Sequence, residues 1–64
     1  MDNKVVELGE ILGFTCQKNM AGKWLIFSLT ENWQLTEVEE KWELSIKETP
    51  QINLNEIDAI AFLK

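Results

Sequence analysis

The sequence predicts a small α+β fold made of an N-terminal helix, a three- or four-stranded antiparallel meander and a C-terminal helix, in a single domain spanning residues 1–64. Three observations predict it. Apolar residues recur at helical spacing near each end of the chain. Residues 24–29 are rich in aromatic and branched side chains, which is typical of a strand. Residues 33–47 contain two stretches that alternate between apolar and polar side chains and can pair with each other.

The first helix is expected over residues 2–13. Asp2 or Asn3 can cap its start, and Gly13 stands where a left-handed residue commonly ends a helix. The apolar stripe expected to face the core consists of Val5, Leu8, Ile11 and Leu12.

A short strand is expected over residues 14–18, followed by a turn over residues 19–22. Residues 24–29 then form the strand that the composition supports most strongly, and it is apolar on both faces. Residues 30–32 suit a tight connection to the next element.

Two interpretations of residues 33–47 compete, and the first is a hairpin. If the turn is centred on Glu39 and Glu40, residues whose numbers sum to 79 face each other. The pairs Trp33 with Ile46 and Leu35 with Leu44 then fall on one face of the sheet, as packing against a core requires.

The second interpretation is a helix, with Thr36 and Glu39 as a capping box. Its apolar stripe would be Leu35, Val38, Trp42 and Ile46. A helix, however, turns Trp33 and Leu44 away from that stripe and removes a pairing partner from the strand at residues 24–29. The hairpin is favoured, and at this stage residues 36–47 stay open between strand and helix.

Thr49 and Pro50 are expected to break the chain before the last helix, over residues 54–63. Asn53 and Asn55 are candidate caps, each with an acidic residue three positions later. The buried stripe is expected to consist of Leu54, Ile57, Ile60 and Ala61, widened by Phe62 and Leu63.

Composition argues against most catalytic functions. The chain has no histidine and one cysteine, so the usual zinc ligand sets and histidine-based acid–base pairs cannot be assembled. Cys16 is expected to act as a small buried hydrophobic residue. The acidic cluster, Glu37, Glu39, Glu40 and Glu43, is expected to be solvated beside a turn and on an outward strand face. We therefore expect no enzyme activity, no catalytic residue, no cofactor and no metal.

Charge and segment composition suggest the compartment and the class of partner. Eleven acidic residues against six lysines give a net charge of −5, which repels nucleic acid and anionic lipid. No secretion signal and no apolar run of about 20 residues is visible in the sequence, so we expect a cytoplasmic protein that does not enter a membrane.

The one hint of function is the strand at residues 24–29. If both helices cover the same face of the sheet, the other face of this strand has nothing to bury against. It would carry either Leu25, Phe27 and Leu29 or Trp24 and Ile26, depending on turn length. We therefore expect a protein-interaction surface around this strand, formed by Trp24, Leu25, Phe27 and Leu29, that binds a protein partner or a second copy of the chain.

Two alternatives stand beside this hypothesis. One helix could cover each face, which would make the strand simply central. Alternatively, the tryptophans could stack on nucleic acid bases from the sheet face, as in some single-strand-binding modules. The candidates for such stacking are Trp24, Trp33 and Trp42.

Overall fold

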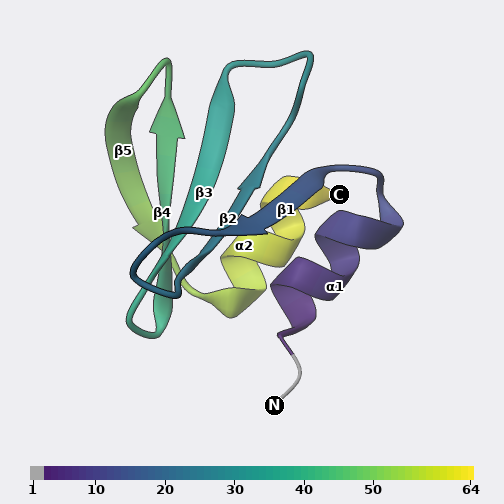
Figure 1. Cartoon of the computed structure of the whole chain (residues 1–64), viewed down its shortest axis with the longest axis horizontal. Coiled ribbons are helices and arrows are strands. Elements are labelled where there is room, and N and C mark those ends of the chain that lie inside the picture. Colours follow the sequence, from purple (N-terminus) through teal and green to yellow (C-terminus); the bar gives the residue numbers. More distant parts are fainter. Residues whose placement is uncertain (1–2) are drawn as a thin grey trace.

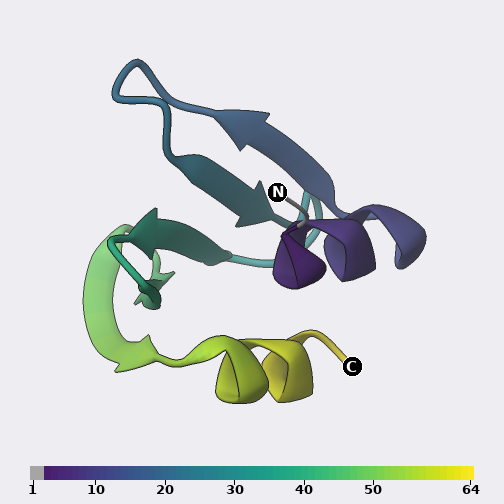
Figure 2. The same ribbon diagram turned by 90° about the horizontal axis from the view of Figure 1, so that it is seen from below.

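The computed structural model describes residues 3–64. These residues form a helix, five strands and a second helix, in the order α1 (Lys4–Ile11), β1 (Thr15–Lys18), β2 (Trp24–Phe27), β3 (Trp33–Val38), β4 (Lys41–Ile46), β5 (Thr49–Leu54) and α2 (Glu56–Leu63). The strands make one antiparallel sheet in which chain order is also spatial order (Figure 1). Figure 2 shows the sheet curling around α1 and α2, which pack against each other. The α+β class is confirmed.

The predicted strand count of three or four was too low, because β5 was missed. Thr49 and Pro50, expected to break the chain, are the first two residues of β5. Proline is tolerated there because β5 is an edge strand with one free side. Every residue of β5 except Leu54 is exposed, so the strand has no apolar–polar alternation to reveal it.

The hairpin interpretation of residues 33–47 is confirmed, and the helix alternative is wrong. β3 and β4 pair in the predicted register, with Trp33 opposite Ile46 and Leu35 opposite Leu44. The connection is the predicted two-residue turn, in which Glu39 has a positive φ of 58°.

The first helix is shorter than predicted, and its buried stripe differs. Asn3 caps it, because the Asn3 side-chain oxygen accepts a hydrogen bond from the Val6 backbone N–H at 3.2 Å. Asp2, the other candidate cap, lies outside the described residues. Ile11 and Leu12 are exposed, and the buried residues are Val5, Val6 and Gly9.

The second helix starts at Glu56, and Leu54 belongs to β5 rather than to the helix. Asn55 is the cap, since its side-chain oxygen accepts from the Asp58 N–H at 2.8 Å. Ile57 was predicted to be buried and is 75% exposed. The buried residues are Ala59 and Leu63, and the small Ala59 side chain is compatible with the close packing of α1 and α2.

The β1–β2 turn forms at residues 19–22, where the sequence predicts it. Asn19 closes the β1–β2 turn by accepting hydrogen bonds from the backbone N–H groups of Ala21 and Lys23. Gly22 has a φ of 79°, which glycine adopts without strain. β2 ends at Phe27, two residues earlier than predicted, so Leu29 lies in the loop that leads to β3.

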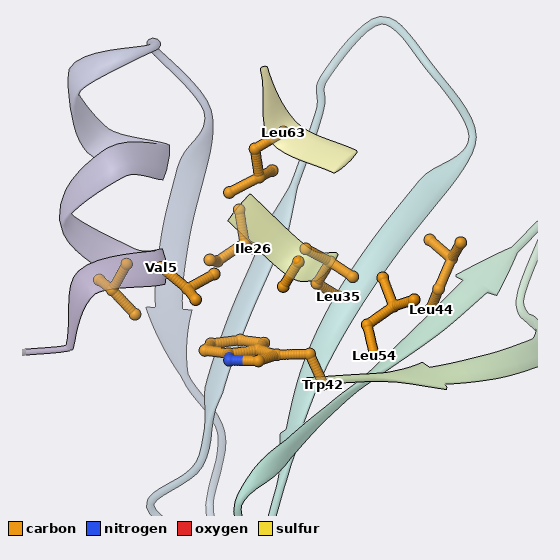
Figure 3. Packing of buried hydrophobic residues seen from close by; sticks show 9 residues of the cluster. Val5, Ile26, Leu35, Trp42, Leu44, Leu54 and Leu63 are labelled. Atoms are coloured by element: carbon orange, nitrogen blue, oxygen red, sulfur yellow. The ribbon is translucent and has the colours of Figure 1, made fainter. Parts of the chain in front are cut away.

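One hydrophobic core joins the helices to the sheet. It consists of Val5, Val6, Ile26, Leu35, Trp42, Leu44, Leu54, Ala59 and Leu63. Figure 3 shows the Trp42 ring projecting from β4 toward Ile26 and Val5, so that it bridges the strands and α1. Because α1, α2 and the strands contribute to the same cluster, α1 and α2 cover the same face of the sheet.

Candidate interaction surface on the open face of the sheet

Alternation along the strands gives the sheet two faces. One lies against α1 and α2 and carries the core residues, among them Ile26 and Leu35. We call the opposite side the open face, because the helices in the described residues 3–64 pack on the other side. Two rows of paired residues cross the open face: Thr15, Phe27, Gln34, Ser45 and Pro50 in one, and Gln17, Leu25, Thr36, Glu43 and Asn53 in the other. Val38 and Lys41 extend it toward the β3–β4 turn.

The four residues expected to form the interaction surface do not lie together: two are on the open face, one is on the helix side and one is in a loop. Leu25 and Phe27 lie on the open face, two residues apart in β2, and each is half-buried. Leu29 is 84% exposed in the loop after β2. Trp24 is on the helix side, where it packs against the core and the Lys18 ammonium group lies 5.3 Å from its ring centroid. The structure therefore brings Leu25 and Phe27 together and separates Trp24 from them.

Polar residues that the sequence interpretation did not assign to the surface surround these two side chains. Thr36 pairs with Leu25, and Gln34 pairs with Phe27. The Gln34 side-chain amide donates a hydrogen bond to the Thr36 hydroxyl at 3.1 Å. The alternation in residues 33–47 could have identified both residues, because they are the polar positions between Trp33, Leu35 and Glu37.

A hollow of about 420 Å³ opens at one end of the open face, beside Phe27. Gln34 and Ser45 line it. The Ser45 side chain is only 8% exposed, although within the described residues no helix packs on the open face. Its rim is formed by the β2–β3 loop and the β4–β5 turn, which are joined by a hydrogen bond of 2.8 Å from the Lys47 N–H to the Asn32 carbonyl. The open face is therefore not flat: it has a recess next to its largest apolar side chain.

The open face carries little charge. Within the described residues the strands contribute two charged side chains to it, Lys41 and Glu43, which have opposite signs and stand two positions apart in β4. Glu31, Lys47 and Glu48 also line the recess at its end. Most of the acidic side chains of this −5 chain lie in the turns and helices, including Glu39, Glu48 and Glu56. The face and its recess therefore carry two lysines and three glutamates, which is a smaller excess of negative charge than that of the whole chain.

The tryptophans all lie on the helix side of the sheet. Trp42 is 4% exposed in the core. Trp33 is held between two phenylalanine rings in edge-to-face contacts, with ring centroids 5.0 Å from Phe14 and 5.1 Å from Phe62. The nucleic-acid hypothesis places tryptophan rings on the open face, and none of the three tryptophans lies there. All three belong to the hydrophobic core or pack against it.

Glu37 differs from the solvated carboxylate that was expected. It lies on the helix side of β3, half-buried, opposite Trp42. One of its oxygens accepts from the Trp24 backbone N–H at 3.2 Å, and the other accepts from the Asn3 side-chain amide at 3.4 Å. The carboxylate therefore connects the start of β2 to the cap of α1, which is a structural role. Within the described residues, no cluster of acidic or cysteine side chains has the arrangement of a metal site.

Cys16 lies on the helix side of β1, opposite Ile26 and partly buried. Burial raises the pKa of its thiol, and the negative charge of Glu10 raises that pKa further. The Cys16 Sγ lies 3.7 Å from the Val6 carbonyl oxygen, consistent with a weak hydrogen bond from the thiol. A raised pKa disfavours the thiolate, which is the nucleophilic form.

Comparisons with known proteins identify no relative. No family model matches the chain, and no curated protein and no solved structure is significantly similar to it. Among residues 3–64, no helix is both long enough and apolar enough to cross a membrane, since α1 and α2 have eight residues each.

Proposed function

We propose that this chain is a small, non-catalytic cytoplasmic protein that acts by binding protein through the open face of its sheet. The binding surface is centred on Leu25 and Phe27, with Leu29 at its margin. One observation carries the proposal: α1 and α2 join a single core on the other side, leaving two large apolar side chains on a face that no described element covers. Apolar side chains gathered on an uncovered face often mark interaction sites.

The composition of the face also supports protein as the ligand. Nucleic-acid binding needs basic side chains that contact phosphates. The open face and its recess offer two lysines, Lys41 and Lys47, among three glutamates, Glu31, Glu43 and Glu48. Threonine, serine, glutamine and asparagine around an aromatic residue provide hydrogen-bonding groups at the rim of an apolar contact, as in many protein interfaces. The recess beside Phe27 can accept a protruding side chain of the partner.

The test compares two variants that introduce the same charge at different places. Phe27→Glu places a carboxylate on the open face. Ile57→Glu makes the same kind of change on α2, where Ile57 is 75% exposed and distant from the proposed surface. Circular dichroism first establishes that both variants keep the secondary structure of the natural chain.

Affinity capture from the native extract then compares the natural chain with both variants. We expect at least one protein, either a different protein or a second copy of the chain, to bind the natural chain and Ile57→Glu equally. We expect the same protein not to bind Phe27→Glu. If folded Phe27→Glu retains every protein that the natural chain captures, the open face is not the binding surface and the proposal is wrong.

A further inference from the structure

We propose that the recess beside Phe27 receives an arginine side chain of the protein partner. This inference rests on the proposed function and names the chemistry by which the partner is recognised. The recess has a volume of about 420 Å³, which lies within the size range of small-ligand sites. Three features of its lining carry the inference: a buried hydroxyl, an excess of negative charge and an aromatic side chain.

Ser45 supplies the hydroxyl. Among residues 3–64 it is the only polar residue that is buried, at 8% exposure, and it lines the recess. Within the described residues no hydrogen bond engages its hydroxyl, and no polar side-chain atom that is sealed from solvent lacks a partner, so the Ser45 oxygen is reached from the recess. Buried polar groups in proteins normally have a hydrogen-bond partner. A donor that enters the recess can provide one for Ser45.

The rim of the recess carries more negative than positive charge. Glu31 and Glu48 each contribute a carboxylate, and Lys47 contributes one ammonium group. The net charge of the whole chain, −5, attracts positively charged partners over longer distances. A cationic side chain is therefore favoured in the recess over a neutral or an acidic one.

An arginine side chain fits this lining better than a lysine side chain does. A guanidinium group is planar, stacks on aromatic rings and presents five N–H donors, whereas an ammonium group is compact and strongly hydrated. The Phe27 side chain lines the recess. The Ser45 hydroxyl can accept a hydrogen bond, and so can Gln34 Oε1, because the bond from Gln34 to Thr36 uses the amide nitrogen. The recess thus combines an aromatic group with acceptors.

The backbone around the recess is held in place before a partner binds. The Ser28 hydroxyl accepts a hydrogen bond from the Glu31 N–H at 3.2 Å, within the β2–β3 loop. The Lys47 N–H donates to the Asn32 carbonyl at 2.8 Å, which joins this loop to the β4–β5 turn. The two segments that carry the carboxylates are therefore fixed relative to each other, which lowers the entropy lost on binding.

Titration of the natural chain with the peptide acetyl-Gly-Arg-Gly-amide, followed by NMR at constant ionic strength, tests the inference. We expect weak, millimolar binding, with chemical-shift changes at the Ser45 backbone amide and the Gln34 side-chain amide. Citrulline in place of arginine keeps the shape and removes the charge, and should weaken binding by roughly tenfold or more. Lysine in the same place should weaken it by roughly threefold. Unchanged shifts at both residues, or equal binding of the arginine peptide and either analogue, contradicts the inference.

Variants of the chain locate the contact, after circular dichroism has shown that they fold. Ser45→Ala should weaken binding of the arginine peptide by roughly tenfold, because it removes a hydrogen bond to a charged group. Glu48→Gln should weaken it by about two- to fivefold, and Lys47→Gln should strengthen it by a similar factor. Glu39→Gln is the matched control, since it removes the same charge from the β3–β4 turn, outside the recess. Equal losses in Glu48→Gln and Glu39→Gln would show general attraction to an acidic chain, which contradicts the inference.

The capture experiment separates this inference from the proposed function. A protein that binds the natural chain but neither Phe27→Glu nor Ser45→Ala supports both. A protein that does not bind Phe27→Glu but binds Ser45→Ala and Glu48→Gln as well as it binds the natural chain supports the open face as the binding surface. That second result contradicts an arginine contact in the recess.

Discussion

Ile26 and Phe27 are neighbours in β2, and their side chains leave the sheet on opposite faces. Ile26 is fully buried between Cys16 and Leu35, its partners in β1 and β3. Phe27 pairs with Thr15 and Gln34 on the open face. A shift of one residue in register would exchange them, so the pairing of β2 with β3 decides which apolar residue is core and which is surface.

Truncating these two neighbours should therefore have very different effects on stability. Ile26→Ala removes a fully buried side chain and should lower the free energy of unfolding by about 2–4 kcal/mol. Phe27→Ala should lower it by about 1 kcal/mol or less, because its side chain is only half-buried and leaves no enclosed cavity. Urea denaturation at low micromolar concentration, where association contributes least, measures both values. Equal losses would place Phe27 in the core.

Gly9 allows α1 to approach the sheet closely, and adding a methyl group there should destabilise the fold. A Cβ atom at Gly9 would lie 3.2 Å from both Cys16 Sγ and Ile26 Cγ2. Alanine favours a helix over glycine by about 1 kcal/mol, and overpacking a core typically opposes folding by about 1–3 kcal/mol. We expect a net loss of about 1 kcal/mol by thermal or urea denaturation.

A double-mutant cycle identifies the cause of that loss. In a Cys16→Ala background the sulfur is absent, so Gly9→Ala should be less destabilising than in the natural chain. The same loss in both backgrounds would show that the Cys16 contact is not responsible.

The β4–β5 turn contains backbone strain that a glycine should relieve. Lys47 and Glu48 connect the pair Ile46 and Thr49, and both have positive φ, at 52° and 68°. Two-residue hairpin turns with positive φ at both positions favour glycine at the second. Glu48→Gly should raise the free energy of unfolding by up to about 1 kcal/mol, since the relief of strain exceeds the entropy added to the unfolded chain.

Glu40→Gly is the matched control, because it removes the same charge from the second position of the other two-residue turn. Among the described residues, the non-glycine positions with positive φ are Glu39, Lys47 and Glu48, so glycine relieves nothing at position 40. We expect this variant to be neutral or less stable than the natural chain. A gain equal to that of Glu48→Gly would attribute the effect to charge rather than to backbone strain.

Cys16 should make stability depend on alkaline pH. Burial raises the pKa of its thiol in the folded chain, so the unfolded chain releases that proton at a lower pH. The contribution to stability is complete below about pH 8.5, the ordinary thiol pKa, and is lost as pH rises through the raised value. The free energy of unfolding of the natural chain should therefore fall more between neutral and alkaline pH than that of Cys16→Ala. Parallel pH profiles for the two proteins would contradict the burial of this thiol.

Much of the fold follows from local patterns that the core reinforces. The hairpin register could be predicted because the apolar residues of β3 and β4 face α1 and α2, so a slip of one residue would turn one apolar set away from the core. The two-residue turn at Glu39 and Glu40 then selects the observed alignment. The turn at Asn19 was recognisable because its side chain bonds to its own turn.

What could not be predicted depends on tertiary contacts. β5 is stabilised by pairing with β4 and buries only Leu54, so its own sequence shows no strand pattern. The helix stripes were misjudged because each helix contacts both the sheet and its neighbour, which buries Val6 and Ala59 and leaves Ile11 and Ile57 in water. The choice between Trp24 and Phe27 for the open face depended on the number of residues in the turns, which alternation alone does not determine.

Nuclear Overhauser effects within one labelled chain, diluted into unlabelled chain, test the central claim that α1 and α2 share one face and leave Phe27 on the other. We predict contacts from the Ile26 methyl groups to Gly9 in α1, and none from the Phe27 ring to α1 or α2 of its own chain. Intramolecular contacts between the Phe27 ring and either helix would show that the face is already covered, and would contradict the account.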